Sequence, residues 1–273
     1  MAQRIVIKSD RQVELMRKAG RLTAQARAYG ASLVRPGITT GELDHAMHSF
    51  IIKHGGYPSF LHLYGFPGTA CISVNDEVIH GIPGKRRLEE GDIVSIDVGA
   101  CVGFEGIDPK TKLPIGGYHG DCAGTFPVGQ VDEEARRLIA VTEQSFWEGI
   151  KHALPGKRIS DISRGVQTYV EANGFSVVRE YVGHGVGAQM HEAPEVPNYV
   201  MTRRLGGDPR LVKNMTIAVE PMVNVGTWQI KVLPDGWTVK TLDGSLAAHY
   251  ENTILITEGD AEVLTVTEDG AYV

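Results

Sequence analysis

One helical pattern occurs twice in the sequence, as PGITTGELDHAMHSFIIKHGGY at residues 36–57 and as PGKRISDISRGVQTYVEANGF at residues 155–175. At an offset of 119 residues, Pro-Gly aligns with Pro-Gly, and the apolar and glycine positions that follow agree. A second correspondence, between GDIVSIDVG and NMTIAVEPM, comes later in the same order and places Asp97 opposite Glu220. Two matches in one order indicate an internal repeat.

Two copies are too few for a solenoid, in which many repeats stack in an array. The repeat therefore predicts a single α+β domain over residues 1–273. Its two pseudo-symmetric halves, each with helices before strands, cover about 1–130 and 131–273.

Composition excludes several classes of protein. Hydrophobic residues make up 42 % and charged residues 22 % of the chain, which is ordinary for a soluble globular protein. The net charge of -6 provides no overall basic field, so we expect no DNA partner. No apolar run approaches the ~18 residues of a membrane span, and the N-terminus has no signal-peptide pattern. Cys71, Cys101 and Cys122 lack paired spacing, which indicates a reducing compartment, and we expect a cytoplasmic protein.

Local patterns predict the main elements. Ser9 with Gln12 resembles a capping box, and helical periodicity, which includes Tyr29, then runs to the stop at 35–37. A second helix is expected at about 39–54. Strands rich in β-branched residues are expected in four runs, at 71–75, 92–100, 215–223 and 252–257.

Acidic residues interrupt apolar runs that normally exclude them. Asp97 lies in VSIDVG, Glu220 in IAVEPM, Glu251 in AHYENTILI, and Asp121 among small residues in YHGDCAGTF. Alternation along a strand would place any one of them on a solvated face. The residues around Asp97 and Glu220 leave no polar face, however, and a buried unpaired carboxylate is costly. The four acids therefore indicate a bound cation.

His184, bracketed by glycines in GHGVG, adds an imidazole to these four carboxylates. Five oxygen and nitrogen donors without a thiolate do not fit a structural zinc site, and calcium rarely accepts imidazole. The set suits two divalent ions bridged by carboxylates, and Mn, Fe, Co and Zn all remain open. Such a pair lowers the pKa of a bridging water towards ~7, which predicts metal-assisted hydrolysis of the aminopeptidase or phosphoesterase kind.

Seven segments in fixed order carry a resemblance to a known family. They are VRPGITTGELD, ACISVNDEVIHGIPG, EGDIVSIDVG, FSVVREYVGHGVGAQMHEAP, TIAVEPMVN, DGWTVKT and HYENTI. Over essentially its full length the chain resembles type I methionine aminopeptidases, which have the pita-bread fold.

The resemblance implies a curved antiparallel sheet around a dinuclear metal site. It implies that a metal-activated water attacks the first peptide bond, and that initiator methionine is removed from nascent chains when the second residue is small. The implied cofactors are two divalent metal ions (Co, Mn, Fe or Zn). The implied partners are N-terminal Met peptides and, transiently, the ribosome, and the implied assembly is a monomer.

The resemblance also assigns roles to residues of this chain. The metal ligands would be Asp97, Asp121, His184, Glu220 and Glu251. Glu220 would also be the general base, His191 would contact the scissile amide, and His80 would lie near the substrate backbone. We expect the glycines around His184 to let the backbone pass close to the metal ions and to adopt positive φ angles where these are needed.

The methionine pocket would be lined by Cys71, Trp237, Phe66, Leu63 and Met190. Relatives often carry tyrosine at the position of Leu63 and phenylalanine at that of Met190, so the substrate range of this chain is open. Tyr64 is a candidate for the missing ring.

The second aspartate ligand also departs from the family pattern. Many relatives space the two aspartates by about eleven residues, which here lands on Asp108. We choose Asp121 for its strand context and interpret Asp108, before Pro109, as a turn residue. The stretch 101–117 is then expected to be an enlarged hairpin loop near the rim of the site.

Three other functions compete with this interpretation. A prolidase or aminopeptidase P, which cleaves Xaa-Pro bonds, usually carries a large N-terminal domain that this sequence lacks. A catalytically inactive pita-bread binding protein would have lost metal ligands, and all five are present. A dinuclear phosphoesterase would not need the apolar pocket or the repeat.

Overall fold

The protein has an α+β fold in a computed structural model that describes residues 4–201 and 207–267. Long helices cover an antiparallel sheet, as the family resemblance implies. The helices are α1 (Asp10–Ser32), α2 (Thr40–Lys53), α3 (Glu133–Ile150) and α4 (Ile159–Ala172). Within the described ranges, no helix is both long and apolar enough to cross a membrane.

The main sheet has the strand order β1-β4-β5-β14-β9-β7-β8, with β2 paired to β4 and β15 to β14. All its strand pairs are antiparallel. The strands are β1 (Tyr57–Pro58), β2 (Ala70–Val74), β4 (Ile93–Ile107), β5 (Pro114–Pro127), β7 (Gly183–Gly185), β8 (Glu192–Val196), β9 (Thr216–Val219), β14 (Glu251–Leu255) and β15 (Glu262–Val263).

Short strands form two smaller antiparallel sheets beside the main one. The first contains β13 (Ala247–His249), β10 (Met222–Asn224) and β6 (Ser176–Val177). The second contains β11 (Ile230–Val232), β12 (Val239–Thr241) and β3 (Glu77–Ile79). A 3-10 turn, η1 (Leu63–Gly65), lies in the loop before β2.

Side chains at the helix starts explain where the helices begin. The Gln12 side chain accepts a hydrogen bond from the Ser9 amide at 2.8 Å, next to the first residue of α1. At α2, Thr39 and Glu42 each accept a hydrogen bond from the other's backbone amide, which forms a capping box. The bounds of α2 and α4 differ by 119 residues at both ends, which supports the proposed repeat.

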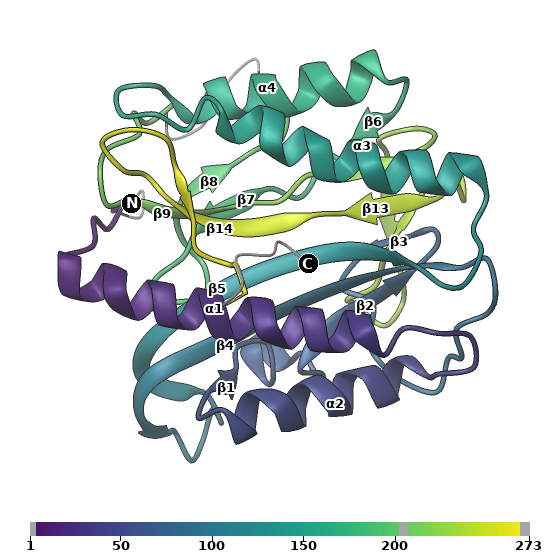
Figure 1. Cartoon of the computed structure of the whole chain (residues 1–273), viewed down its shortest axis with the longest axis horizontal. Helices are drawn as coiled ribbons and strands as arrows, with labels where there is room; N and C mark the ends of the chain where they lie inside the picture. Colours follow the sequence, from purple (N-terminus) through teal and green to yellow (C-terminus); the bar gives the residue numbers. More distant parts are fainter. Residues whose placement is uncertain (1–3, 202–206, 268–273) are drawn as a thin grey trace.

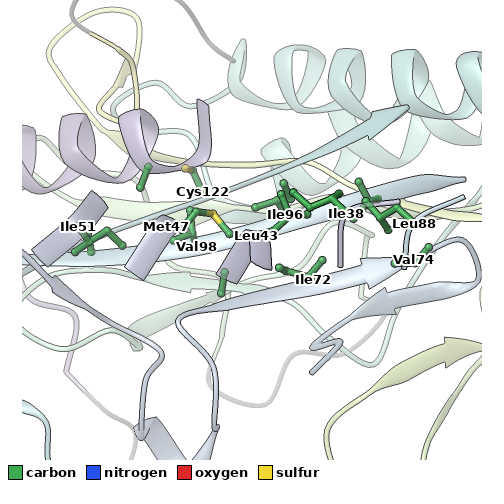
Figure 2. Close-up of a cluster of buried hydrophobic side chains, with 14 of the residues drawn as sticks. Ile38, Leu43, Met47, Ile51, Ile72, Val74, Leu88, Ile96, Val98 and Cys122 are labelled. Carbon is green, nitrogen blue, oxygen red and sulfur yellow. The ribbon is translucent and has the colours of Figure 1, made fainter. Parts of the chain in front are cut away.

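The helices pack on the sheet in two pairs. In Figure 1, α1 and α2 lie along the β4–β5 half, and α3 and α4 lie along the half that holds β14, β9 and β7. Figure 2 shows Leu43, Met47 and Ile51 of α2 facing Ile96 and Val98 of β4, and all five side chains are fully buried. Each half therefore has its own apolar core beneath its helix pair.

Two details differ from the sequence predictions. Tyr29, predicted on the inner stripe of α1, is 40 % exposed, because its ring stacks on Phe50 of α2 at 5.2 Å instead of entering the core. The stretch 101–117 is not a loop, since β4 and β5 continue as a paired ribbon and leave only 108–113 as a turn. Asp108 is a turn residue, as predicted, and its Oδ1 accepts hydrogen bonds from the amides of Lys110 and Thr111.

A glycine lets α1 approach the sheet closely. A Cβ on Gly120 of β5 would lie 2.8 Å from Thr23 Oγ1 and 2.9 Å from the backbone of Ala19. The Thr23 hydroxyl is fixed at this point, because it donates to the Ala19 carbonyl at 2.8 Å and accepts from the Ala100 amide at 3.2 Å. Any side chain at position 120 must therefore push α1 off the strands that carry the site.

We predict that Gly120→Ala lowers the free energy of unfolding by about 1–3 kcal/mol, as overpacked sites do. The matched control is Gly106→Ala on the same ribbon, where a Cβ would meet nothing within 4 Å. Its effect should stay within about 0.5 kcal/mol. Urea denaturation of the two variants measures both values, and equal stabilities would contradict the packing argument.

Candidate active site

Five neighbouring strands of the sheet each bring one predicted metal ligand to a common point. In strand order, β4 carries Asp97, β5 carries Asp121, β14 begins with Glu251, Glu220 directly follows β9, and β7 carries His184. The four acids are between 2 and 9 % exposed. The first half of the chain therefore supplies two of these side chains and the second half supplies three.

The hydrogen bond of His184 orients its ring. Nδ1 lies 2.9 Å from the carbonyl oxygen of Gly185, so it carries the proton and donates to that oxygen. Nε2 is then unprotonated and lies 3.5 Å from Asp121 Oδ2 and 3.7 Å from Glu220 Oε1. A lone pair directed between two carboxylates is the arrangement of a metal-ligating histidine.

The glycines around His184 serve strand packing. A Cβ on Gly183 would lie 2.4 Å from the Ala218 carbonyl oxygen, and one on Gly185 would lie 2.3 Å from that of Ala193. Neither these two nor Gly187 has a positive φ, so that part of our expectation is wrong. Side chains are excluded at these two positions of β7 because the backbones of the neighbouring strands β9 and β8 lie against them.

Burial disfavours the ionised forms of these acids. It raises the pKa of Asp97 to about 7, against a hydrogen bond from Asp121 and the charge of Arg27. The pKa values of Asp121, Glu220 and Glu251 lie well above the ordinary carboxyl range, because burial is reinforced by the neighbouring carboxylates. A cation bound between the acids would favour their ionised forms and so lower these pKa values.

The donor set fits divalent metal ions. Asp97 Oδ1, Asp121 Oδ1 and Glu251 Oε1 are buried and have no hydrogen-bond partner among the described residues. Their side chains belong to two groups of possible ligands, Asp121–His184–Glu251 and Asp97–His249–Glu251, and the donor atoms of each group lie within 4.8 Å of one another. Glu251 belongs to both groups, as expected of a bridging carboxylate.

His249 is a member of this cluster that the sequence analysis missed. It is 2 % exposed, neither ring nitrogen has a hydrogen-bond partner within the described part of the chain, and Nε2 lies 3.7 Å from Glu251 Oε2. Its position two residues before Glu251 in AHYEN was the available signal, because alternate residues of an extended chain point to one face.

A cavity of about 440 Å³ opens onto the acids. Its apolar wall includes Cys71, Trp237, Phe66 and Leu63, as predicted, together with Phe60. Met190 does not line it and instead packs, 3 % exposed, in the cluster of Phe60, Phe66 and Cys71 behind the wall.

No residue of the ribbon at 101–117 is among the described residues that line this cavity, so the ribbon forms no part of its wall. Glu180, Tyr181 and Glu195 also line it and were not anticipated. They flank the His184 segment in sequence.

Two of the predicted histidines, His191 and His80, line this cavity. His191 packs edge-on against His184, with ring centroids 4.4 Å apart, and the Tyr64 ring stacks on His191 with centroids 5.9 Å apart. His80 has a left-handed φ of 58° and packs edge-on against Tyr181 and Trp237. Desolvation, with a smaller effect of His184, lowers the pKa of His191 to about 3, although part of this residue is exposed at the cavity, and burial lowers that of His80 to about 4. Both rings are therefore neutral at neutral pH.

Comparison with known proteins identifies the family. Residues 14–258 match metallopeptidase family M24. A methionine aminopeptidase of Clostridium perfringens is 51 % identical over 262 residues, which cover 96 % of this chain and 99 % of that protein. Methionine aminopeptidase 1 of Bacillus subtilis is 47 % identical, with coverage of 96 % and 99 %.

The chain belongs to metallopeptidase family M24. Within this family it groups with the methionine aminopeptidases, so the predicted resemblance is confirmed. As a metallopeptidase of family M24 it uses divalent metal ions, for which the buried donor set is suited.

Solved structures confirm the pita-bread fold of this M24 peptidase. The crystal structure of methionine aminopeptidase from Thermotoga maritima has a TM-score of 0.88 and 41 % identity, and the match covers 96 % of this chain and 99 % of that one. The prolidase from Pyrococcus furiosus matches with a TM-score of 0.73 at 22 % identity, over 66 % of its own length. That likeness shows a shared fold alone.

We predict that Asp121→Asn weakens binding of Mn²⁺ by at least about a hundredfold, since even the outer partners of metal ligands are worth about 10–100-fold in affinity. Asp108→Asn is the matched control, because that carboxylate accepts backbone hydrogen bonds within the 108–113 turn and does not belong to the ligand cluster. Titration calorimetry on the two variants and the parent decides the ligand. If Asp108→Asn lost Mn²⁺ binding and Asp121→Asn kept it, Asp108 would be the ligand instead of Asp121.

Proposed function

We propose that this M24 peptidase is a methionine aminopeptidase that removes the N-terminal methionine of nascent chains when the second residue is small. One observation carries this function: an apolar cavity with a soft sulfur neighbour, Cys71, ends at a cluster of buried acids and His184. The activity of the relatives that are 47–51 % identical over nearly their whole length supports it.

Asp97, Asp121, His184, Glu220 and Glu251 would hold two divalent ions, which supply an acidified water and polarise the carbonyl of the first peptide bond. Glu220 lines the cavity, and its backbone carbonyl accepts a hydrogen bond from Asn198 Nδ2 at 2.8 Å, which fixes the strand end that carries it. We assign Glu220 as general base. Its carboxylate takes a proton from the attacking water and returns it to the leaving amine as the C–N bond breaks.

His191 and His80 are neutral, and a neutral imidazole offers one N–H donor and one acceptor. We propose that His191 donates to the carbonyl oxygen of the scissile amide as negative charge develops there. His80, which its left-handed backbone presents into the cavity, would bind the substrate backbone. Neither role requires a change of protonation at neutral pH.

The apolar end of the cavity suits a thioether. Phe66 and Trp237 pack edge-on with centroids 5.1 Å apart, and sulfur makes favourable contacts with aromatic rings. Burial and the nearby Asp97 charge raise the pKa of Cys71 well above its ordinary value, so the thiol stays protonated and acts as a small apolar group. Leu63 leaves this wall aliphatic at a position where the family often has a ring.

We further propose a monomer in the cytoplasm that contacts the ribosome transiently, with Co, Mn, Fe or Zn as the metal. The three cysteines are free thiols, which supports a reducing compartment. The mixed oxygen and nitrogen donors suit all four metals.

The test is hydrolysis of Met-Ala-Ser by the enzyme reconstituted with Mn²⁺. We expect release of free methionine, and we expect Glu220→Gln to lower kcat by about 10²–10⁴-fold, the range for a lost general base. His191→Ala should lower kcat, whereas His45→Ala, at an exposed position of α2, should leave it unchanged. Cleavage of Xaa-Pro peptides without release of methionine would instead indicate a prolidase.

A further inference from the structure

A buried ion pair lies directly under the loop that carries His191. Lys8 Nζ donates to Glu192 Oε2 at 2.6 Å, and the two side chains are only 2 and 9 % exposed. Lys8 belongs to the segment before α1, and Glu192 is the first residue of β8. The pair therefore joins residues that are 184 positions apart in sequence.

Both oxygens of the Glu192 carboxylate hold the loop. Oε2 accepts from Lys8, and Oε1 accepts from the backbone amide of Gln189 at 3.1 Å. The backbone of Glu192 pairs with Gly185, next to His184. His191 is thus confined between a turn that the Glu192 side chain ties down and a strand that the Glu192 backbone pairs.

Gly187 makes room for this pair. A Cβ at position 187 would lie 2.4 Å from Glu192 Oε1 and 2.7 Å from Lys8 Cε, although the φ of this glycine is not left-handed. The carbonyl oxygen of Gly187 accepts from the His119 amide of β5 at 2.9 Å, and its amide donates to the Gln189 carbonyl at 3.0 Å. The last glycine of GHGVG therefore accommodates the ion pair.

The segment that carries Lys8 is itself fixed. The Lys8 amide donates to the Asn214 carbonyl at 3.0 Å, and the Lys8 ammonium also donates to the Val6 carbonyl at 3.3 Å. Ile5 packs against the apolar core of the second half. Lys8 is therefore held from both sides, as a rigid support for the loop must be.

We propose that Lys8 is a positioning residue for His191, acting through Glu192. This inference rests on the proposed function. Without the ammonium, Glu192 is a buried carboxylate with no counter-charge that must move towards water, and the turn 187–191 moves with it. His191 then loses its place beside His184, while the metal ligands, which lie on other strands or on β7, keep theirs.

Kinetics of Met-Ala-Ser hydrolysis by the Mn²⁺-loaded full chain test the proposal. A displacement of about 1 Å far from the chemistry can cost about a hundredfold in rate, so Lys8→Met should lower kcat by about 10–100-fold. KM and the Mn²⁺ stoichiometry should stay near their original values. Lys213→Met, which removes the exposed Lys213–Glu258 pair, is the control and should change nothing.

The decisive comparison places Lys8→Met in a His191→Ala background. If Lys8 acts through His191, the second substitution should cost less than about twofold there, since residues that act as a unit are not additive. An equal loss in both backgrounds, or unchanged kcat in Lys8→Met alone, would overturn the proposal.

Glu192→Gln keeps the size of the side chain and one acceptor oxygen, and it tests the same proposal if Lys8→Met does not fold. It should show the same non-additive pattern with a smaller loss, and an additive loss would count against the proposal.

The ring signals of labelled His191, assigned by their absence in His191→Ala, should shift in Lys8→Met while those of exposed His45 stay. This spectroscopic result does not depend on methionine release, so failure of the proposed function is distinguishable from failure of the inference.

Discussion

Four carboxylates lie at the centre of one sheet, and burial there penalises each negative charge that they carry. The sheet brings them together because neighbouring strands β4, β5, β14 and β9 each contribute one, with His184 arriving on β7. Without a positive charge between them, their ionised forms are disfavoured, as the raised pKa values of Asp121, Glu220 and Glu251 express. Metal binding is therefore the condition under which this interior becomes an ordinary ionised site.

The seam between the two halves of the chain passes through this cluster. β5 and β14 pair only at Ala123 with Glu251 and at Cys122 with Asn252. Arg27, fully buried on α1, donates to the carbonyl oxygens of Ala123 at 2.7 Å and Glu251 at 3.2 Å, one on each strand. Its charge also lowers the pKa values of Asp97 and Glu251, against the larger effect of burial. The Arg27 guanidinium thus holds β5 and β14 together and offsets part of the repulsion between the carboxylates.

The sequence predicts α1, α2 and the acids well because all of them follow from local rules. A capping box marks the starts of α1 and α2, and an acid such as Asp97 among β-branched residues has no solvated face to occupy. The ribbon at 101–117 was mistaken for a loop because its glycines favour turns, whereas the pairing of β4 with β5 overrides that preference.

Other contacts depend on distances that no local pattern contains. Lys8 and Glu192 are an unremarkable lysine and glutamate in sequence, and only the folded chain brings them within 2.6 Å. The family resemblance places Met190 on the cavity wall, but its side chain packs in the cluster of Phe60, Phe66 and Cys71. His249 went unnoticed because a histidine before an aromatic residue has no distinctive pattern of its own.

The most direct test of the acid cluster is the number of protons released when Mn²⁺ binds near pH 6.5. Calorimetric titration in two buffers with different ionisation enthalpies measures it. Asp97, with a pKa of about 7, binds a proton at this pH, and the metal must expel it. The raised pKa values of Asp121, Glu220 and Glu251 act in the same direction. We predict release of at least about one proton per chain and weaker metal binding as the pH falls. Tight binding without proton release would contradict the account, because the carboxylates would then already be ionised in the buried sheet.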